Sequence, residues 1–507
     1  MQKRIILAFS LSMLIMITWS ALVSKPQPIV NKEVALSEVT LPKQEVLNNI
    51  AEAKPSLAEK TGRDIEVIAD QWGKIIFSEN EAAISDVSFK NYNYQNLLLN
   101  EGLSLKGSNK FVLLENTPKS IKFVQSDKDK KIIKDFIFCK PKYCIELYIS
   151  ITNNSNTDLK FAFPLVLGVI KDSKDQLLGR YEDVTVAVAN KFTHVNLKND
   201  KDFSNVKYLS YRDRYFSLIV EPVEGNYSGY IRRFNGIKGS EIGLISGDYL
   251  IKPGQTHIEK FAIYLGPQDL SHINNVSTSW GNIVNYGTFD FFGQIIFQSM
   301  EMIFKIVHNW GVVIIILGVF IYLLFYPLTN KQMRSMKAMQ ALQPKVEELR
   351  ARLKDNPQKL NKEIMALYRE NKVNPLSGCL PILLQIPIFF ALYQVLMRSV
   401  ALKGAEFLWI KDLAEPDRLF ILPKNIPLLG NEINLLPILM AIGMFMQNKL
   451  SMSSSSGASA EQQKLMMFML PIVFGFLFYH MPSGLVLYWF VNSLLMLVNQ
   501  IKLNLAK

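Results

Sequence analysis

One apolar stretch with a single amide inside it constrains this chain more than any other feature. The stretch 376–400 exceeds the about 20 residues that a helix needs to cross a bilayer, and Gln385 lies roughly 14 Å inside it at 1.5 Å per helical residue. Pro381 and Pro387 lie on either side of this amide. In hydrocarbon it finds no water unless the protein supplies some. Gln385 therefore either bonds to a neighbouring helix, the commoner arrangement in a bundle, or lines a wet cavity.

The apolar residues of the chain are gathered in two places. Hydrophobic residues make up 49% of the 507 residues, and their long runs lie at the very start and after residue 308. The middle of the chain lacks such runs, so we expect a membrane protein with a large water-exposed insert. The net charge of +12 fits Lys and Arg in cytoplasmic loops better than specific nucleic-acid recognition, because no basic motif is interleaved with aromatic residues.

The N-terminal segment predicts a membrane anchor. Lys3 and Arg4 precede the apolar run Ile5–Val23, which is longer than the core of a usual signal peptide and lacks a clear small-residue cleavage site. We therefore expect an uncleaved anchor over 1–23, with its N-terminus in the cytoplasm, rather than a cleaved signal peptide. Residues 24–60 are rich in Lys, Glu, Pro and Gln, which predicts a flexible linker.

Residues 61–287 have the pattern of a β-rich domain outside the cytoplasmic membrane. Short alternating segments punctuated by Asn, Asp and Gly predict an antiparallel β-sandwich; examples are 110–114, 132–138, 144–151, 184–188, 215–220 and 257–264. His194, His257 and His272 are scattered, and each is better explained as a surface or packed side chain than as a catalytic base. With no catalytic constellation in the sequence, we expect a protein that is not an enzyme.

Two cysteines flank a predicted hairpin tip in this domain. Cys139 and Cys144 enclose Lys140-Pro-Lys-Tyr143, and an oxidising compartment favours a disulfide between them. The alternative is two unpaired thiols near a turn. A metal site is disfavoured, because the pair offers only two ligands and has no nearby histidine. We expect neither a metal nor a cofactor.

The rest of the chain predicts an interfacial helix and five further membrane spans. Residues 288–307 mix large apolar residues with a few polar ones, as in an amphipathic helix that lies in the membrane interface. The predicted spans are 308–328, 376–400, 433–449, 464–481 and 484–502, with a periplasmic loop at 401–432 and a cytoplasmic loop at 450–463. The first of these helices is expected to end at Tyr326-Pro327, because a helix is strained just before proline.

The loop 329–375 determines the predicted orientation. It is rich in Lys and Arg, which marks a cytoplasmic loop by the positive-inside rule. Six spans from a cytoplasmic start agree with that side. We therefore expect a multi-pass protein of the bacterial inner membrane, with both termini in the cytoplasm and the large domain in the periplasm.

The same loop predicts a charged helical hairpin. Its first part carries an apolar stripe at helical spacing, made of Leu342, Val346, Leu349 and Leu353. Pro357 suits the first turn of a second helix, with Asn356 as its cap. The loop is long for a mere connector, so we expect it to dock a cytoplasmic partner. The basic residues expected to do so are Lys345, Arg350, Arg352 and Lys354.

Polar residues recur at similar depth in different predicted spans. Gly318 and Tyr322 share one face of 308–328, and Tyr488, Asn492 and Asn499 share one face of the last span. Together with Gln385 they lie mostly in the cytoplasmic half of the bilayer. Several such groups on different helices predict a shared hydrated recess that does not cross the membrane. No inner-half span carries Asp, Glu or His, which disfavours a proton relay or an ion-coupled pump.

A series of motifs covers 309–500 in a fixed order. It includes Asn309-Trp-Gly311, Tyr326-Pro-Leu-Thr329, Leu342-Gln-Pro-Lys345, Gln385-Ile-Pro-Ile-Phe389 and Pro482-Ser-Gly-Leu-Val-Leu-Tyr488. In these motifs the chain resembles the YidC family of bacterial membrane-protein insertases, in the type with a large periplasmic domain. The resemblance implies a periplasmic β-sandwich, an N-terminal anchor plus five core helices, a cytoplasmic helical hairpin, and a hydrophilic groove open to cytoplasm and lipid.

The resemblance also implies a function. Members of the family act as insertases and chaperones for nascent inner-membrane proteins, alone or with the Sec translocon, and the ribosome and targeting machinery are implied as further partners. Tyr488 and Trp489 are implied as client-contacting residues. One position departs from the family pattern: an arginine usually stands four residues before the tyrosine of Tyr326-Pro-Leu-Thr329, where this chain has Tyr322. Its groove therefore lacks that fixed positive charge.

Two other classes of protein stay open as alternatives. A small-solute transporter predicts a cavity that reaches both sides of the membrane and internal repeats, and the sequence shows no repeat. A membrane-anchored periplasmic enzyme or binding protein for sugars predicts paired carboxylates in a cleft of the sandwich. The sequence does not reveal such a pair.

Overall fold

The computed structural model describes residues 63–505 except for 70–72, 93–94, 109, 172–180, 190, 235–238, 286–289, 354–355, 372, 374–379, 427–429 and 452–457. All described residues belong to one compact unit, Lys60–Lys507. The predicted anchor and linker lie outside the described residues, and so does Lys354 of the hairpin.

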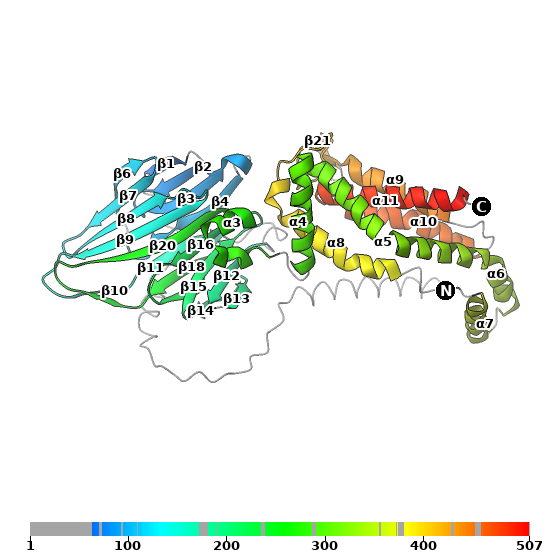
Figure 1. Cartoon of the computed structure of the whole chain (residues 1–507), viewed down its shortest axis with the longest axis horizontal. Helices are drawn as coiled ribbons and strands as arrows, with labels where there is room; N and C mark the ends of the chain where they lie inside the picture. The colour runs from blue at the N-terminus through cyan, green and yellow to red at the C-terminus, as the bar shows by residue number, and fades with distance from the viewer. Residues whose placement is uncertain are drawn as a thin grey trace. The chain divides into compact units, whose positions relative to one another are not determined.

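The first part of the described chain is β-rich (Figure 1). Its strands are β1 (Asp64–Ala69), β2 (Gly73–Ser78), β3 (Ala83–Phe89), β4 (Gln95–Gly102), β5 (Ser104–Leu105), β6 (Val112–Thr117), β7 (Ser120–Ser126), β8 (Lys130–Phe138), β9 (Cys144–Asn153), β10 (Leu159–Phe161), β11 (Pro164–Lys171), β12 (Asp183–Val188), β13 (Lys191–Val195), β14 (Lys201–Phe203), β15 (Val206–Arg212), β16 (Phe216–Pro222), β17 (Tyr227–Arg233), β18 (Gly239–Ser246), β19 (Tyr249–Ile251) and β20 (Thr256–Pro267). The segments quoted above as alternating each overlap one of these strands, because period-two alternation buries one face of a strand.

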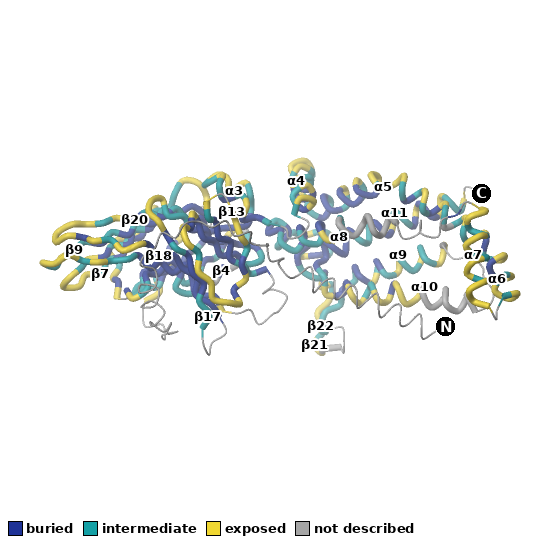
Figure 2. The backbone as a smooth tube through the Cα atoms, turned by 90° about the horizontal axis from the view of Figure 1, so that it is seen from below, coloured by how far each residue is buried: buried dark blue, intermediate teal, exposed yellow. Residues whose placement is uncertain are grey.

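The strands form antiparallel sheets around one apolar core. The largest sheet has the order β13-β12-β15-β16-β20-β9-β8-β7-β6, and a second has the order β14-β17-β18-β11-β5. The two face each other where β15 meets β17 and β18. A separate four-stranded sheet has the order β1-β2-β3-β4. Its strand β2 alternates between buried and half-buried residues, whereas every residue of β18 in the five-stranded sheet is buried. Figure 2 shows this dark core running through the domain.

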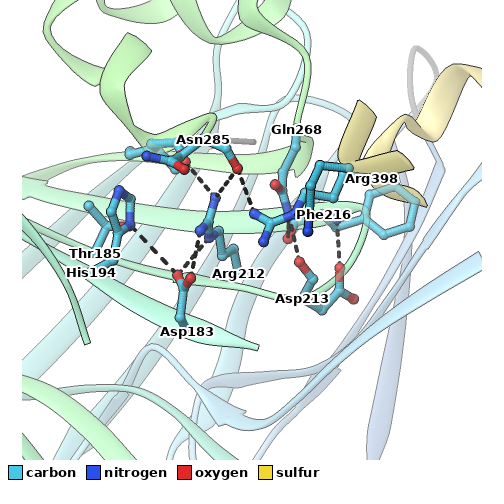
Figure 3. A network of polar contacts seen from close by, with 11 residues as sticks. Asp183, Thr185, His194, Arg212, Asp213, Phe216, Gln268, Asn285 and Arg398 are labelled. Carbon is cyan, nitrogen blue, oxygen red and sulfur yellow. Dashed lines mark hydrogen bonds and ion pairs between the residues drawn. The ribbon is translucent and has the colours of Figure 1, made fainter. Parts of the chain in front are cut away.

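A buried arginine joins the large sheet to the segment that leaves the domain (Figure 3). Arg212, 3% exposed, donates from Nε and Nη2 to the two carboxylate oxygens of Asp183, both at 2.6 Å. Its Nη1 donates to the Ile283 carbonyl at 2.9 Å and to that of Asn285 at 3.4 Å. The Asn285 carbonyl also accepts from Arg398 at 2.5 Å. The strand end, the exit segment and α8 are therefore held by one set of polar contacts.

The three histidines of the domain are packed side chains, in line with the expectation. His194 Nδ1 lies 2.9 Å from Thr185 Oγ1, and His257 Nε2 lies 2.9 Å from a carboxylate oxygen of Glu259. The third, His272, packs edge-on against Tyr143. The Thr185 hydroxyl beside His194 is fully buried, so it is not placed to attack a substrate.

Helices make up most of the remainder. They are α3 (Leu270–Val276), α4 (Asp290–Val307), α5 (Trp310–Ala341), α6 (Gln343–Arg352), α7 (Pro357–Glu370), α8 (Leu380–Arg398), α9 (Leu435–Ser451), α10 (Ala458–Leu477) and α11 (Ser483–Leu505), with short 3-10 turns at Lys90–Tyr92, Thr278–Ile283 and Val400–Leu402 and a hairpin of β21 (Phe420–Ile426) and β22 (Gly430–Ile433). Among described residues α5 and α11 are long and apolar enough to cross a bilayer, and Ile388–Arg398, Leu435–Leu450 and Met467–Leu477 are shorter apolar helical stretches. Each predicted span overlaps one of these helical segments.

Helix α5 does not end where the sequence predicts. The expected end at Tyr326-Pro327 is wrong, because α5 continues through Pro327 to Ala341. Proline lacks an N–H, so its direct cost is the one hydrogen bond that would reach the Leu323 carbonyl. The regular backbone hydrogen bonds of the helix resume after Pro327. As a result Thr329, which is buried, and Asn330, whose side-chain oxygen is buried, are helical residues rather than parts of a loop.

Helix α4 buries one face and exposes large apolar side chains on the other. Gly293, Ile296, Phe297 and Met300 are buried, and α4 packs on α5 and α8. Its exposed apolar residues are Phe291, Phe292, Ile295, Met302 and Ile306. Figure 1 draws α4 across the direction of α9 and α11. Both features suit a helix lying in a membrane interface.

The segment between α8 and α9 covers the first turns of α5 and α11. Backbone N–H groups at the start of α11 donate to this segment: Ser483 to the Glu415 carbonyl at 2.8 Å and Gly484 to the Leu413 carbonyl at 2.9 Å. Phe407 packs so closely on Gly311 that a Cβ there would lie 2.1 Å from its ring. These contacts satisfy helix-terminal donors and fix one end of the bundle.

Candidate functional site

The candidate site is the seam between α5 and α11. Gly318 lies on this seam, where a Cβ would be in ordinary contact with both Tyr488 and Val491 at 3.5 Å. Tyr488 is 1% exposed. Further along, the Lys337 Nζ donates to the Leu503 carbonyl at 2.6 Å. The two helices thus stay in contact over several turns, and the predicted shared face of Gly318 and Tyr322 does meet α11.

Uncharged polar groups are buried along this seam. Tyr322 and Thr329 on α5 are buried, as are Asn492 and Asn499 on α11. The Asn499 amide donates to the Met333 sulfur at 3.0 Å, a weak acceptor. Within the part of the chain that the structure describes, the Tyr322 hydroxyl and the Asn330 side-chain oxygen are buried without a hydrogen-bond partner. The seam therefore combines one direct polar contact with unused hydrogen-bonding capacity.

Trp489 belongs to a different cluster from Tyr488, although the two are adjacent in the sequence. Its ring packs against Phe389 of α8 at 5.5 Å, against Phe474 of α10 at 6.0 Å, and against Phe478, just after α10, at 5.6 Å between centroids. Its indole Nε1 is buried without a partner among described residues. Consecutive helical residues point about 100° apart. The pair expected to act together therefore faces α5 with one ring and α8 and α10 with the other.

The structure describes only some of the other residues that were predicted to form the site. Gln385 lies within α8, but its side chain is outside the described residues, and Lys354 lies outside them altogether. On α6, Lys345, Arg350 and Arg352 are exposed. Helix α7 begins at Pro357 with Asn356 as its cap, since the Asn356 side chain accepts from the Lys359 N–H at 3.0 Å. This confirms the predicted cap.

Three buried polar groups were not predicted from the sequence: the Asn330 side-chain oxygen on α5, and Ser493 and Gln500 on α11. Of these, Ser493 lies against Gly443 of α9 rather than on the α5 side. Asn330 was hidden by the expected helix end at Pro327. Ser493 and Gln500 each follow a residue that the helical spacing did pick out, Asn492 and Asn499. A search for polar stripes two adjacent residues wide on a helix surface would have identified Ser493 and Gln500.

The site offers no catalytic or metal-binding arrangement among described residues. No group of three or more His, Cys, Asp or Glu residues there has the geometry to hold a metal ion. The buried polar residues of α5 and α11 are hydroxyls and carboxamides, which bind by hydrogen bonds and do not supply acids or bases near neutral pH. The arrangement suits transient binding of polar groups or water.

A β-rich domain joined to apolar helices with buried amides defines a membrane protein with a large water-exposed domain, and comparisons with known proteins agree. Residues 302–507 match the family described as 60Kd inner membrane protein, and residues 100–299 match the YidC periplasmic domain. The chain is 30% identical to the membrane protein insertase YidC of Pelobacter propionicus over 99% of both chains. It is 40% identical to that of Francisella tularensis subsp. novicida over 58% of this chain and 50% of the other.

The chain belongs to the YidC family of membrane protein insertases. Its domain of β-strands matches the family's periplasmic domain, and its helical part matches the 60Kd inner membrane protein family. Members of the family insert membrane proteins and are not enzymes. This agrees with the function implied by the motifs between Asn309 and Tyr488.

Proposed function

We propose that the buried polar residues of α5 and α11 line a hydrated recess in the cytoplasmic half of the membrane, which receives polar parts of a client protein during insertion. The observation that carries this proposal is the unused hydrogen-bonding capacity of the Tyr322 hydroxyl and the Asn330 side-chain oxygen. A buried polar atom without a partner costs about 1–3 kcal/mol. Water or a client's polar groups supply the missing partner.

The recess acts by shortening the path of polar groups through hydrocarbon. A client's polar segment exchanges hydrogen bonds with water for bonds with Tyr322, Asn492 and water in the recess. Its apolar segment then moves past the aromatic cluster around Trp489 into lipid. Burial of apolar surface, worth roughly 25 cal/mol per Å², favours that step. Because Tyr322 replaces the usual arginine, the recess works by hydration rather than by attraction of acidic client tails.

The proposed orientation in the membrane is the one that the basic loop 329–375 predicts. The N-terminal anchor and five core helices span the inner membrane, α4 lies in its outer interface, and the β-rich domain lies in the periplasm. The α6–α7 hairpin lies in the cytoplasm. Exposed basic residues of α6, Lys345, Arg350 and Arg352, dock the ribosome or the targeting machinery there, and the Sec translocon is a further partner for larger clients.

Paired substitutions test the recess. Tyr322→Phe with Asn492→Leu removes one hydroxyl and one amide from the seam. The matched control is Tyr326→Phe with Asn504→Leu, which makes the same changes at the exposed Tyr326 and at Asn504 near the end of α11. In cells depleted of the wild-type protein, the first variant is expected to slow insertion of a small inner-membrane client at least tenfold, and the control less than twofold.

Gln385→Leu with Asn492→Leu extends the test to α8. This pair is expected to impair insertion as strongly as the first. Equal insertion rates for wild type and both test variants, at equal protein levels, would overturn the recess. Normal insertion after depletion of the protein itself would contradict the insertase function in this organism.

A further inference from the structure

The two cysteines of the β-rich domain lie directly opposite each other. The last paired residues of the β8–β9 hairpin are Phe138 and Ile145, and the Cys139 N–H donates to the Cys144 carbonyl at 3.1 Å. Opposed residues of antiparallel strands have Cα atoms about 4.5–5.5 Å apart, inside the roughly 4.4–6.8 Å that a disulfide spans. The structure has both as free thiols.

The turn between them is not a loose tip. Tyr143 is fully buried, and its backbone has φ +68°, the left-handed region that disfavours a residue with a bulky side chain. Its ring packs against Phe89 at 5.9 Å, Tyr264 at 6.1 Å and His272 of α3 at 5.1 Å. Its carbonyl accepts from the Leu265 N–H at 2.8 Å. The hairpin tip thus holds a strained residue that joins β9, β20 and α3.

We propose that Cys139 and Cys144 form a disulfide in the exported domain, and that this bond keeps Tyr143 inserted in the core. The proposal rests on the proposed orientation, which puts the domain in an oxidising compartment. The covalent ring closes around Lys140-Pro-Lys-Tyr143 and removes extended alternatives of this segment from the unfolded chain. The Cys144 N–H donates to the Pro141 carbonyl at 3.3 Å, so the folded backbone already forms a tight turn that accommodates a closed ring.

The environments of the two thiols set the order of the chemistry. The neighbouring Cys144 thiol lowers the pKa of Cys139, whereas contact with Cys139 raises the pKa of the buried Cys144. Cys139 is therefore the attacking thiolate. It attacks the disulfide of a periplasmic dithiol–disulfide oxidant protein, forming a mixed disulfide and freeing one oxidant thiol. Cys144 then loses its proton and attacks the Cys139 sulfur, and the oxidant leaves as a dithiol, having taken up two electrons and two protons.

Thiol trapping in cells tests the bond. Cells that make the full chain are quenched in acid, denatured and alkylated, with and without prior reduction, and the peptides are measured by mass spectrometry. The expected result is a Cys139–Cys144 cross-link, with Cys379 alkylated before reduction. Alkylation of Cys139 and Cys144 without reduction overturns the proposal, and so does a bond from either one to Cys379 or to a small thiol.

Protease added to intact spheroplasts separates this result from the orientation. Cleavage of the domain together with free thiols overturns the disulfide and leaves the orientation standing. A protected domain with free thiols overturns both.

A thermal measurement tests the effect on Tyr143. The purified full-length Cys139→Ser/Cys144→Ser variant is expected to unfold about 4–8 °C below the oxidised wild type, and a reductant is expected to bring the wild type to the same midpoint. Cys379→Ser is the matched control and keeps the sensitivity to reductant. Equal midpoints for the oxidised wild type and the double variant would show that the bond does not hold Tyr143.

Discussion

The β-rich domain and the helical part bury polar groups in different ways. The domain buries charges, among them Lys134, Arg212 and Glu241, and each has a partner. Arg212 bonds to Asp183, Glu241 accepts from Lys106 at 2.9 Å, and Lys134 donates to the carbonyls of Ala82 and Leu103. In contrast, the buried polar residues of α5 and α11 are hydroxyls and carboxamides.

This difference distinguishes polar groups that hold the fold together from polar groups that can bind a new partner. A buried charge is tolerated only with permanent partners, so the domain's charged groups act as fixed links between strands. Burying an uncharged amide or hydroxyl without a hydrogen-bond partner costs less free energy than burying an unpaired charge. Such a group can also exchange its partner for water or for a client. Unpartnered hydroxyls such as Tyr208 also occur among the described residues of the domain. Those on α5, the Tyr322 hydroxyl and the Asn330 side-chain oxygen, differ in lying on a helix long and apolar enough to cross a bilayer.

Removing the charge of Arg212 should have the largest effect on stability. Arg212→Met leaves Asp183 without its bidentate partner and the Ile283 carbonyl without a donor, so we expect a loss of about 3–5 kcal/mol in the free energy of unfolding. Chemical denaturation of the full-length protein measures it. Arg232→Met breaks the pair with the exposed Asp202 and is the control, expected to cost under about 1 kcal/mol. Equal costs would contradict the fixed-link interpretation.

Lys134 makes the domain sensitive to pH. Burial lowers the pKa of Lys134 to about 7, so above pH 7 the folded chain has released a proton that the unfolded chain still binds. The free energy of unfolding therefore rises with pH, by about 2 kcal/mol between pH 7 and 9. Lys134→Met should flatten this rise, whereas Lys131→Met, at an exposed position on the same strand, should keep it. An unchanged slope in Lys134→Met would assign the pH dependence elsewhere.

Two glycines of α5 sharpen the comparison within the helical part. A Cβ at Gly311 would lie 2.1 Å from the Phe407 ring, whereas at Gly318 it would meet Tyr488 at an ordinary 3.5 Å. Gly311→Ala should thus cost about 1–3 kcal/mol through forced repacking, and Gly318→Ala close to nothing. Thermal unfolding in detergent measures both. A larger cost at Gly318 would mean that the α5–α11 seam is tighter than its spacing indicates.

The smallest effect is expected at the hairpin. Asn356→Ala removes the side-chain acceptor of the Lys359 N–H and should weaken α7 by about 1 kcal/mol. Because no described residue of α7 is buried, hydrogen exchange should speed up in its first turn alone. Faster exchange in α5 or α11 as well would show that the hairpin is coupled to the membrane part.

Local patterns in the sequence predicted much of this architecture. Alternation located strands such as β8 and β9, and Asn356-Pro357 located the start of α7, because each depends on neighbours in the chain. Contacts between distant segments had no such signal. The Arg212 network joins residues 183, 212 and 283, and nothing in the sequence pairs them. Trp489 and Tyr488 were expected to act together, but helix geometry sends them to different neighbours.

The end of α5 was missed for a physical reason. A proline is a strong local breaker, but a helix whose other turns are supported by packing can lose one hydrogen bond and continue. The sequence therefore identified Tyr322, Asn492 and Asn499 for the seam but placed Thr329 at a helix end and omitted Asn330. Both lie beyond Pro327.

The most direct test of the recess is water access at Asn492. In a background without native cysteines (Cys139→Ser, Cys144→Ser and Cys379→Ser), Asn492→Cys is treated with a water-soluble maleimide, which reacts only with a hydrated thiol, in inside-out vesicles and in spheroplasts. Leu494→Cys, on the same helix but 38% exposed on its outer face, is the control. A recess that is open only to the cytoplasm predicts labelling of Asn492→Cys from the cytoplasmic side alone and no labelling of Leu494→Cys. No labelling from either side, or labelling from the periplasm as well, would contradict it.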